Sequence, residues 1–63
     1  MRKLKKSLVL IVWNELTGCR ADIPRLPRGH FDEIFAIDGG STDGTVEYLQ
    51  AEKIPVFRQT ATG

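Results

Sequence analysis

The sequence has too few cysteine and histidine residues for the usual supports of a small protein. It contains one cysteine and one histidine among 63 residues. One cysteine cannot form an internal disulfide, and one cysteine with one histidine cannot complete a four-ligand zinc site. A chain of about 60 residues buries only ~60% of the surface that it exposes when unfolded, so its core is small. We therefore expect self-association or membership in a larger protein, and most complete enzymes are excluded.

A long apolar run is also lacking. The longest one, residues 8–13, is far shorter than the ~20 residues that a membrane-spanning helix needs. No small-residue cleavage site follows it, because Asn14 and Glu15 come next, and this argues against a signal peptide. The sequence therefore predicts a cytoplasmic protein.

Positive charge is concentrated at the N-terminus. The first six residues hold four basic side chains, whereas residues 7–63 hold five basic and eight acidic ones. We interpret residues 1–6 as a solvated basic leader, which would make the only membrane contact, at the inner face of the membrane. The mildly acidic remainder forms no basic surface, so we expect no nucleic-acid partner.

Three short apolar runs, rich in β-branched and aromatic residues, predict three strands. These are Ser7–Trp13, Glu33–Ile37 and Ile54–Phe57. Because the first run is continuously apolar, we expect helices on both faces of its sheet.

Two helices are predicted between the strands. The second spans Thr42–Lys53, with Ser41 or Thr42 as N-cap, Asp43 near the positive end of the helix dipole and Lys53 near the negative end.

The first helix is predicted over Thr17–Ile23, with a further turn near Pro24–Leu26, because prolines and glycines interrupt anything longer. The alternation of strands and helices predicts an α/β fold, a small three-stranded parallel sheet with two right-handed crossover helices.

The segment Asp38–Thr45 follows the second strand and opens the second helix. This segment therefore lies at the carboxyl end of a strand, the edge at which open α/β sheets bind their ligands. Its glycines let a ligand approach the backbone, and Asp38 offers a carboxylate to a base N–H or a ribose hydroxyl. The alternative is a turn in which Asp38 binds backbone amides and no ligand is involved. The residues themselves leave both interpretations open.

Trp13, Asn14 and Glu15 end the first strand, at the same edge as Asp38 if the sheet is parallel. An aromatic side chain there can stack on a nucleobase, and Glu15 adds a hydrogen-bond acceptor. Taken alone, this segment favours the alternative that Trp13 covers the end of the core. The two segments together favour a nucleotide site.

The order and spacing of these segments resemble the N-terminal part of family 2 glycosyltransferases of the GT-A fold, similar to the dolichyl-phosphate and undecaprenyl-phosphate sugar transferases. An apolar strand runs into Trp13-Asn14-Glu15, and the run Phe31–Asp38 precedes Gly40-Ser41-Thr42-Asp43-Gly44-Thr45. The resemblance covers about residues 7–58 and implies the nucleotide-binding half of a Rossmann-like domain. The nucleotide-binding residues that it implies are Trp13, Asn14, Glu15, Asp38, Gly39, Gly40 and Ser41.

The resemblance also implies a parent reaction, the transfer of a sugar from a nucleoside-diphosphate sugar to a lipid phosphate or glycan acceptor. Gly39 stands where many relatives have a second acidic residue, and the proline-broken segment 24–27 replaces a regular first helix. The family holds a divalent metal, Mg²⁺ or Mn²⁺, on an Asp-x-Asp motif, which this sequence lacks. We therefore assign this chain no catalytic residue, metal ligand or resident cofactor, and we expect weak donor binding without sugar transfer.

These observations predict one partial domain over residues 1–63. It comprises the leader 1–6, the nucleotide-binding segment 7–58 and a tail, 59–63, which has no periodicity and is predicted to be truncated. The alternative is a structural α/β module that binds no ligand and associates with itself. An open strand edge invites pairing, so this alternative predicts a homodimer through Ser7–Trp13.

Overall fold

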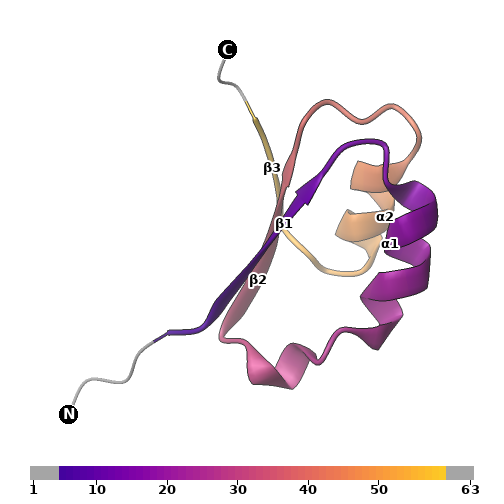
Figure 1. Cartoon of the computed structure of the whole chain (residues 1–63). Helices are drawn as coiled ribbons and strands as arrows, with labels where there is room; N and C mark the ends of the chain where they lie inside the picture. The colour runs from indigo at the N-terminus through magenta and orange to yellow at the C-terminus, as the bar shows by residue number, and fades with distance from the viewer. Residues whose placement is uncertain (1–4, 60–63) are drawn as a thin grey trace.

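The chain forms one parallel sheet with two helices packed against it, as Figure 1 shows. The computed structural model describes residues 5–59. The strands are β1 (Ser7–Val12), β2 (Glu33–Asp38) and β3 (Val56–Arg58). The helices are α1 (Leu16–Asp22), α2 (Thr45–Ala51) and two 3₁₀ turns, η1 (Ile23–Arg25) and η2 (Arg28–His30).

The sheet has the order β1-β2-β3, and both neighbouring pairs are parallel. This confirms the predicted small α/β fold with a parallel three-stranded sheet. In the register, Val12 lies beside Asp38, and Asp38 lies beside Arg58. The three strands therefore end at one edge.

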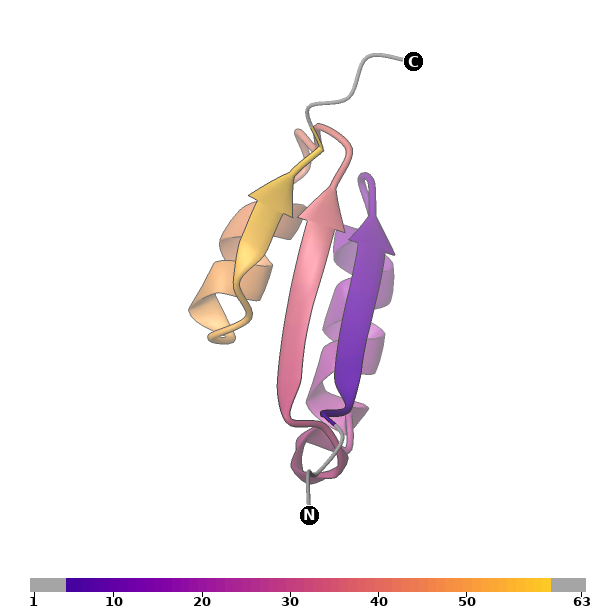
Figure 2. The same cartoon turned by 90° about the vertical axis from the view of Figure 1, so that its left-hand side faces the viewer.

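The prediction that helices cover both faces is wrong for the described residues. Figure 2 shows α1 and α2 behind the sheet and its other face uncovered. Even-numbered residues of β1 turn toward the helices, and Val12 is buried, whereas Val9 and Ile11 are 40% and 72% exposed. The prediction was wrong because it assumed that every apolar residue of the strand would be buried, whereas apolar side chains also occur on exposed surfaces. Both sides of β1 are apolar, and only one of them meets a helix.

The core lies between the sheet and the two helices. Among residues 5–59, six buried apolar side chains form it: Val12, Cys19, Ile23, Ala36, Leu49 and Ile54. Leu49 and Ala36 have no exposed surface, and Leu10, Leu26, Ile34, Tyr48 and Val56 pack around the cluster. So few buried residues support only a marginally stable fold.

The second helix is shorter than predicted at both ends. It begins at Thr45 because Gly44 takes a left-handed conformation, with φ of 97°. Neither Ser41 nor Thr42 caps it, and Gly44 is the N-cap instead. It ends at Ala51, after which Lys53 also has a positive φ, 66°, and turns the chain toward β3. Consequently Ile54 is buried beneath the helix and does not belong to the strand.

The first crossover contains the predicted helix and proline turn, each displaced by one residue toward the N-terminus. Arg28 then fastens the crossover to the end of α2: its guanidinium donates to the Glu52 carbonyl at 2.8 Å and pairs with the Glu52 carboxylate at 3.5 Å. Of the predicted basic leader, Lys5 and Lys6 lie in the described part, and residues 1–4 lie outside it. Residues 60–63 of the predicted tail also lie outside it.

Within residues 5–59, no helix has the length and apolar character needed to cross a membrane.

Candidate functional site at the carboxyl edge of the sheet

The loops that follow β1 and β2 meet at the carboxyl edge of the sheet and are held together by reciprocal hydrogen bonds. The Asn14 amide donates to the Ser41 hydroxyl at 2.8 Å, and the Thr42 amide donates to the Asn14 side-chain oxygen at 2.8 Å. The Gly39 amide also donates to the Val12 carbonyl at 2.9 Å. The two segments that sequence analysis combined into one site are thus in direct contact. Asn14 is positioned for this by a left-handed backbone, with φ of 47°.

Asp38 organises the second of these loops from within. One carboxylate oxygen accepts from the Gly40 and Ser41 amides, both at 2.8 Å, and the other accepts a short hydrogen bond from the Ser41 hydroxyl. The residue is only 1% exposed. These contacts agree with the alternative given by the sequence, a turn in which the Asp38 carboxylate binds backbone amides. A ligand at the edge would meet the loop surface before it met this carboxylate.

The environment of Asp38 favours its ionised form. Burial by itself raises the pKa of this carboxyl, but hydrogen bonds from Ser41 and Gly40 and the nearby Arg58 charge lower it more. The net pKa lies below the ordinary value of an aspartate. The carboxylate is therefore a permanent acceptor for the loop at neutral pH.

Asp43 and Thr45 join the N-termini of both helices, a role that sequence analysis missed. The Asp43 carboxylate accepts from the Leu16 amide of α1 at 3.1 Å and from the Thr45 amide of α2 at 3.0 Å. Thr45 is fully buried, donates its hydroxyl to Asp43 and accepts from the Glu15 amide at 3.0 Å. The sequence indicated only the contact of Asp43 with α2, because Asp43 directly precedes that helix. Its contact with the Leu16 amide of α1 depends on how the chain brings the two helices together.

Trp13 is the large exposed side chain of this edge. It is 63% exposed, and it lies over Gly39, where a Cβ atom would stand 3.6 Å from the indole ring. It therefore does not close the core, which was the alternative interpretation of this residue. An indole held against a loop glycine offers one face to a flat ligand.

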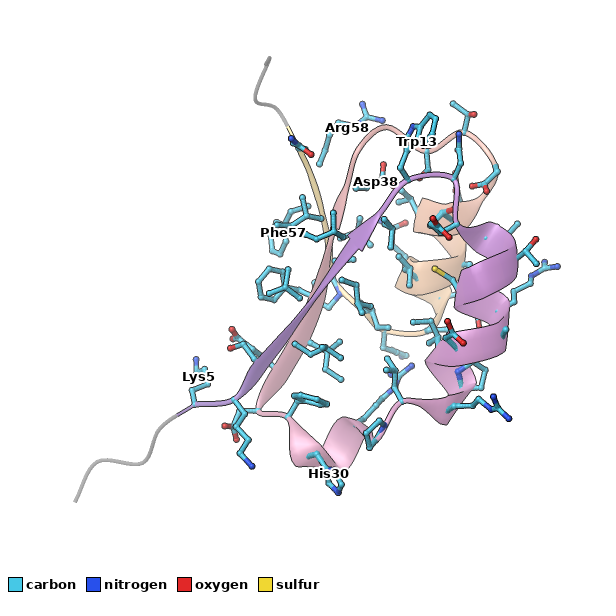
Figure 3. All side chains as sticks on the ribbon, in the orientation of Figure 1. Lys5, Trp13, His30, Asp38, Phe57 and Arg58 are labelled. Atoms are coloured by element: carbon cyan, nitrogen blue, oxygen red, sulfur yellow. The ribbon has the colours of Figure 1, made fainter. Side chains whose placement is uncertain are left out.

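Arg58 is a second residue of the edge that sequence analysis did not identify. It follows the predicted third strand by one residue and is the register partner of Asp38. Figure 3 shows Trp13, Asp38 and Arg58 at the same end of the sheet, opposite Lys5 and His30. Among residues 5–59, Arg58 makes no ion pair within 4 Å, and its side chain is exposed. It is available to an anionic ligand.

Glu15 lines a groove whose walls include neither Trp13 nor Arg58. Together with Gly18, Cys19 and Asp22 of α1, it lines a shallow groove of about 280 Å³ beside β1. Burial and the Glu15 carboxylate raise the pKa of the Cys19 thiol. The structure thus places this acidic side chain on the α1 side of the edge, and only its backbone amide joins the interlocked loops.

The described residues offer no ligand set for the divalent metal that the resemblance implies. Between residues 5 and 59, no three His, Cys, Asp or Glu side chains are grouped so that they could hold a metal ion. The carboxylates of Asp38 and Asp43 serve the loop instead. Comparisons of the chain with protein-family models, with curated proteins and with solved structures find no match.

The loop depends on Gly44, which permits a direct prediction. Its φ of 97° is unfavourable for other residues, and a Cβ atom would lie 3.4 Å from a Leu16 methyl. We expect Gly44→Ala to lower the free energy of unfolding by about 1–3 kcal/mol, measured by urea denaturation. Gly29→Ala is the control, because no atom lies within 4 Å of a Cβ there. Equal effects of the two substitutions would contradict the argument.

Proposed function

We propose that this chain is the nucleotide-binding segment of a family 2 glycosyltransferase, which binds the nucleoside-diphosphate part of a sugar donor at the carboxyl edge of its sheet. The sequence order and spacing described above support the family. The observation that carries the site is the exposed Trp13 indole, held over Gly39 at the same edge as the unpaired Arg58.

In this proposal each side chain has a separate role. Trp13 stacks on the base or ribose, a contact worth about 1–3 kcal/mol per base in proteins that bind single strands. Arg58 supplies positive charge to the diphosphate, because a guanidinium binds phosphate oxygens in a bidentate manner. Asp38 and Ser41 keep the loop in shape for the ligand, since both of their side chains are occupied within it. A divalent metal is no part of the proposed site, because the described residues offer no ligands for it.

The proposal concerns binding, with transfer of the sugar to a lipid phosphate or glycan as the reaction of the whole enzyme. Only Trp13 and Arg58 contact the ligand in this proposal, so the contact is small and we expect dissociation constants in the millimolar range.

Titration of the full chain with UDP, GDP and uridine tests the proposal. We expect amide chemical-shift changes at residues 13–15 and 38–45, and quenching of the fluorescence of Trp13, the sole tryptophan. Trp13→Ala should weaken UDP binding by about tenfold or more, because the stacking surface is lost. Arg58→Gln should weaken the binding of UDP and leave that of uridine unchanged, since uridine has no phosphate.

Arg25→Gln is the matched control, because this exposed arginine lies in η1, far from the edge. Unchanged spectra at millimolar nucleotide would refute nucleotide binding by this chain.

A further inference from the structure

The outer edge of β1 has no neighbouring strand among residues 5–59. β1 is the first strand of the sheet order, and Figure 2 shows it at one side of the sheet. The Gly39 amide donates to the Val12 carbonyl, so the even-numbered residues of β1 direct their backbone groups toward β2. The N–H and C=O groups of Val9 and Ile11 therefore face outward, because these groups alternate along a strand. A row of such groups is a template for another strand.

A groove of about 280 Å³ lies beside this edge, between β1 and α1. Its apolar lining includes Leu10, Val12 and Ile23. Gly18 of α1 also lines it, and the Glu15 carboxylate lies so close to this glycine that a Cβ atom there would stand 3.3 Å from Oε2. A strand added to the edge of β1 would direct every second side chain into this groove.

Two carboxylates give the groove a negative charge. Glu15 is the N-cap of α1 and Asp22 is its last residue, and both line the groove. Both side chains are exposed, and among the described residues neither forms an ion pair within 4 Å. Burial raises the pKa of the Cys19 thiol in the same groove, and the charges of Glu15 and of two aspartates raise it further. The groove is therefore complementary to a strand that carries positive charge.

The separation of the two carboxylates indicates which spacing of positive charges fits them. The seven residues from Glu15 to Asp22 span about 10 Å along the helix. Strand residues four positions apart are about 13 Å apart and lie on one face, with one further side chain midway between them. Long basic side chains can bridge this difference, and an apolar residue midway fits the apolar lining. The N-terminal segment of this chain has this pattern, with Arg2, Leu4 and Lys6.

We propose that residues 2–6 of a second copy of this chain pair with the outer edge of β1 as an antiparallel strand. The second copy's Leu4 enters the groove, its Arg2 lies toward Glu15 and its Lys6 lies toward Asp22. Because residues 2–6 directly precede β1, a twofold axis perpendicular to the sheet lets each copy pair with the other in the same way. The contact is closed, and it uses the strand through which the sequence predicted a homodimer.

The alternation of the side chains agrees with this pairing. Outward-facing backbone groups belong to odd-numbered residues, so the odd-numbered residues of the two copies exchange hydrogen bonds and the even-numbered ones oppose each other. Opposed side chains lie on the same face of a sheet, which directs Arg2, Leu4 and Lys6 to the helix side, where the groove lies. Lys5 remains on the other face, where its ion pair with Glu33, at 3.5 Å, is undisturbed.

Sedimentation equilibrium of the full chain between about 10 µM and 1 mM measures this association. We expect a monomer–dimer equilibrium. Asp22→Lys should raise the dissociation constant at least fivefold, because the twofold axis places the altered charge in two contacts. Lys6→Glu should have a similar effect, and the chain with both substitutions should regain the wild-type constant, since each ion pair is restored with its charges exchanged. Gln50→Lys, at an exposed position of α2, introduces the same charge as a control and should leave the equilibrium unchanged.

Amide hydrogen exchange identifies the surface that is used. The Val9 and Ile11 amides face outward, so they should exchange freely at about 10 µM and become protected at about 1 mM. Amide spectra establish that each variant is folded.

The proposal would be overturned by a wild-type chain that stays monomeric at 1 mM, or by a dimer whose Val9 and Ile11 amides exchange freely. It would also be overturned if the double variant associated no more tightly than the single variants, or if Gln50→Lys weakened association as much as Asp22→Lys. Nucleotide binding by these variants is a separate measurement, because Trp13 and Arg58 are unchanged in them.

Discussion

Leu49→Ala is expected to leave most of the chain unfolded at 25 °C. Leu49 has no exposed surface and lies at the centre of the core, on the side of α2 that faces the sheet. Removing a buried leucine side chain costs about 2–5 kcal/mol, through lost burial and the cavity left behind. A single core of this size supplies only about 3–5 kcal/mol, so the substitution consumes most or all of the stability.

Circular dichroism with urea denaturation measures this effect, in dilute protein so that association does not contribute. Gln50→Ala is the matched control, because it removes an exposed side chain from the next position of the same helix. It should change the free energy of unfolding by less than about 0.5 kcal/mol. A Leu49→Ala variant with wild-type stability would show that α2 does not pack as described.

Asp38→Ala is expected to have the next largest effect, a loss of about 3 kcal/mol from the free energy of unfolding. The substitution removes a buried, charged acceptor and leaves the Gly40 and Ser41 amides and the Ser41 hydroxyl without their partner. Asp38→Asn keeps one acceptor oxygen for the two amides, so its cost should be about 1 kcal/mol at pH 7. Urea denaturation at pH 7 measures both variants.

The same carboxylate makes stability depend on pH. The pKa of Asp38 is lower in the folded chain than its ordinary value, so the folded state binds fewer protons than the unfolded state as the carboxyl titrates. Its contribution is complete above the unfolded pKa and is lost as the pH falls below about 4 toward the folded pKa. The Thr45 hydroxyl lowers the pKa of Asp43 and adds a dependence in the same direction.

The free energy of unfolding of Asp38→Asn should therefore fall less steeply than that of the wild type between pH 5 and pH 2. Asp22→Asn is the control, since the described residues give its exposed carboxylate no hydrogen bond. A wild-type acid transition in Asp38→Asn would contradict the role assigned to this carboxylate.

The buried position of Asp38 also changes how a ligand should be sought. Because its removal disturbs the loop, a loss of nucleotide binding in Asp38→Ala would not separate a contact from a collapsed loop. Trp13 and Arg58 are exposed, so their substitution leaves the hydrogen bonds of the loop intact. They are the informative positions for nucleotide binding.

The sequence by itself determined the elements and their order. The apolar runs located three strands, and Lys53 and the prolines helped to place the helix ends within a few residues of the observed ones, whereas the start at Gly44 was not predicted. These signals are local, because dihedral preference and side-chain periodicity depend on near neighbours. The alternation of strand and helix then gave a parallel sheet, so the expectation that Trp13 and Asp38 share an edge followed from topology alone.

Only the tertiary structure decided which face of the sheet is covered and which side chains are free. Val9 and Val12 are equally apolar in the sequence, yet one is exposed and the other is buried, because both helices lie on the same side. Asp38 and Arg58 are likewise both charged residues at strand ends. The loop surrounds the first and leaves the second free, since hydrogen-bond partners 2 and 3 residues away fold over Asp38. The turn around Asp38 is local, and the sequence left it open beside the ligand interpretation, whereas the covered face of the sheet depends on contacts between distant segments, which residue type and spacing do not specify.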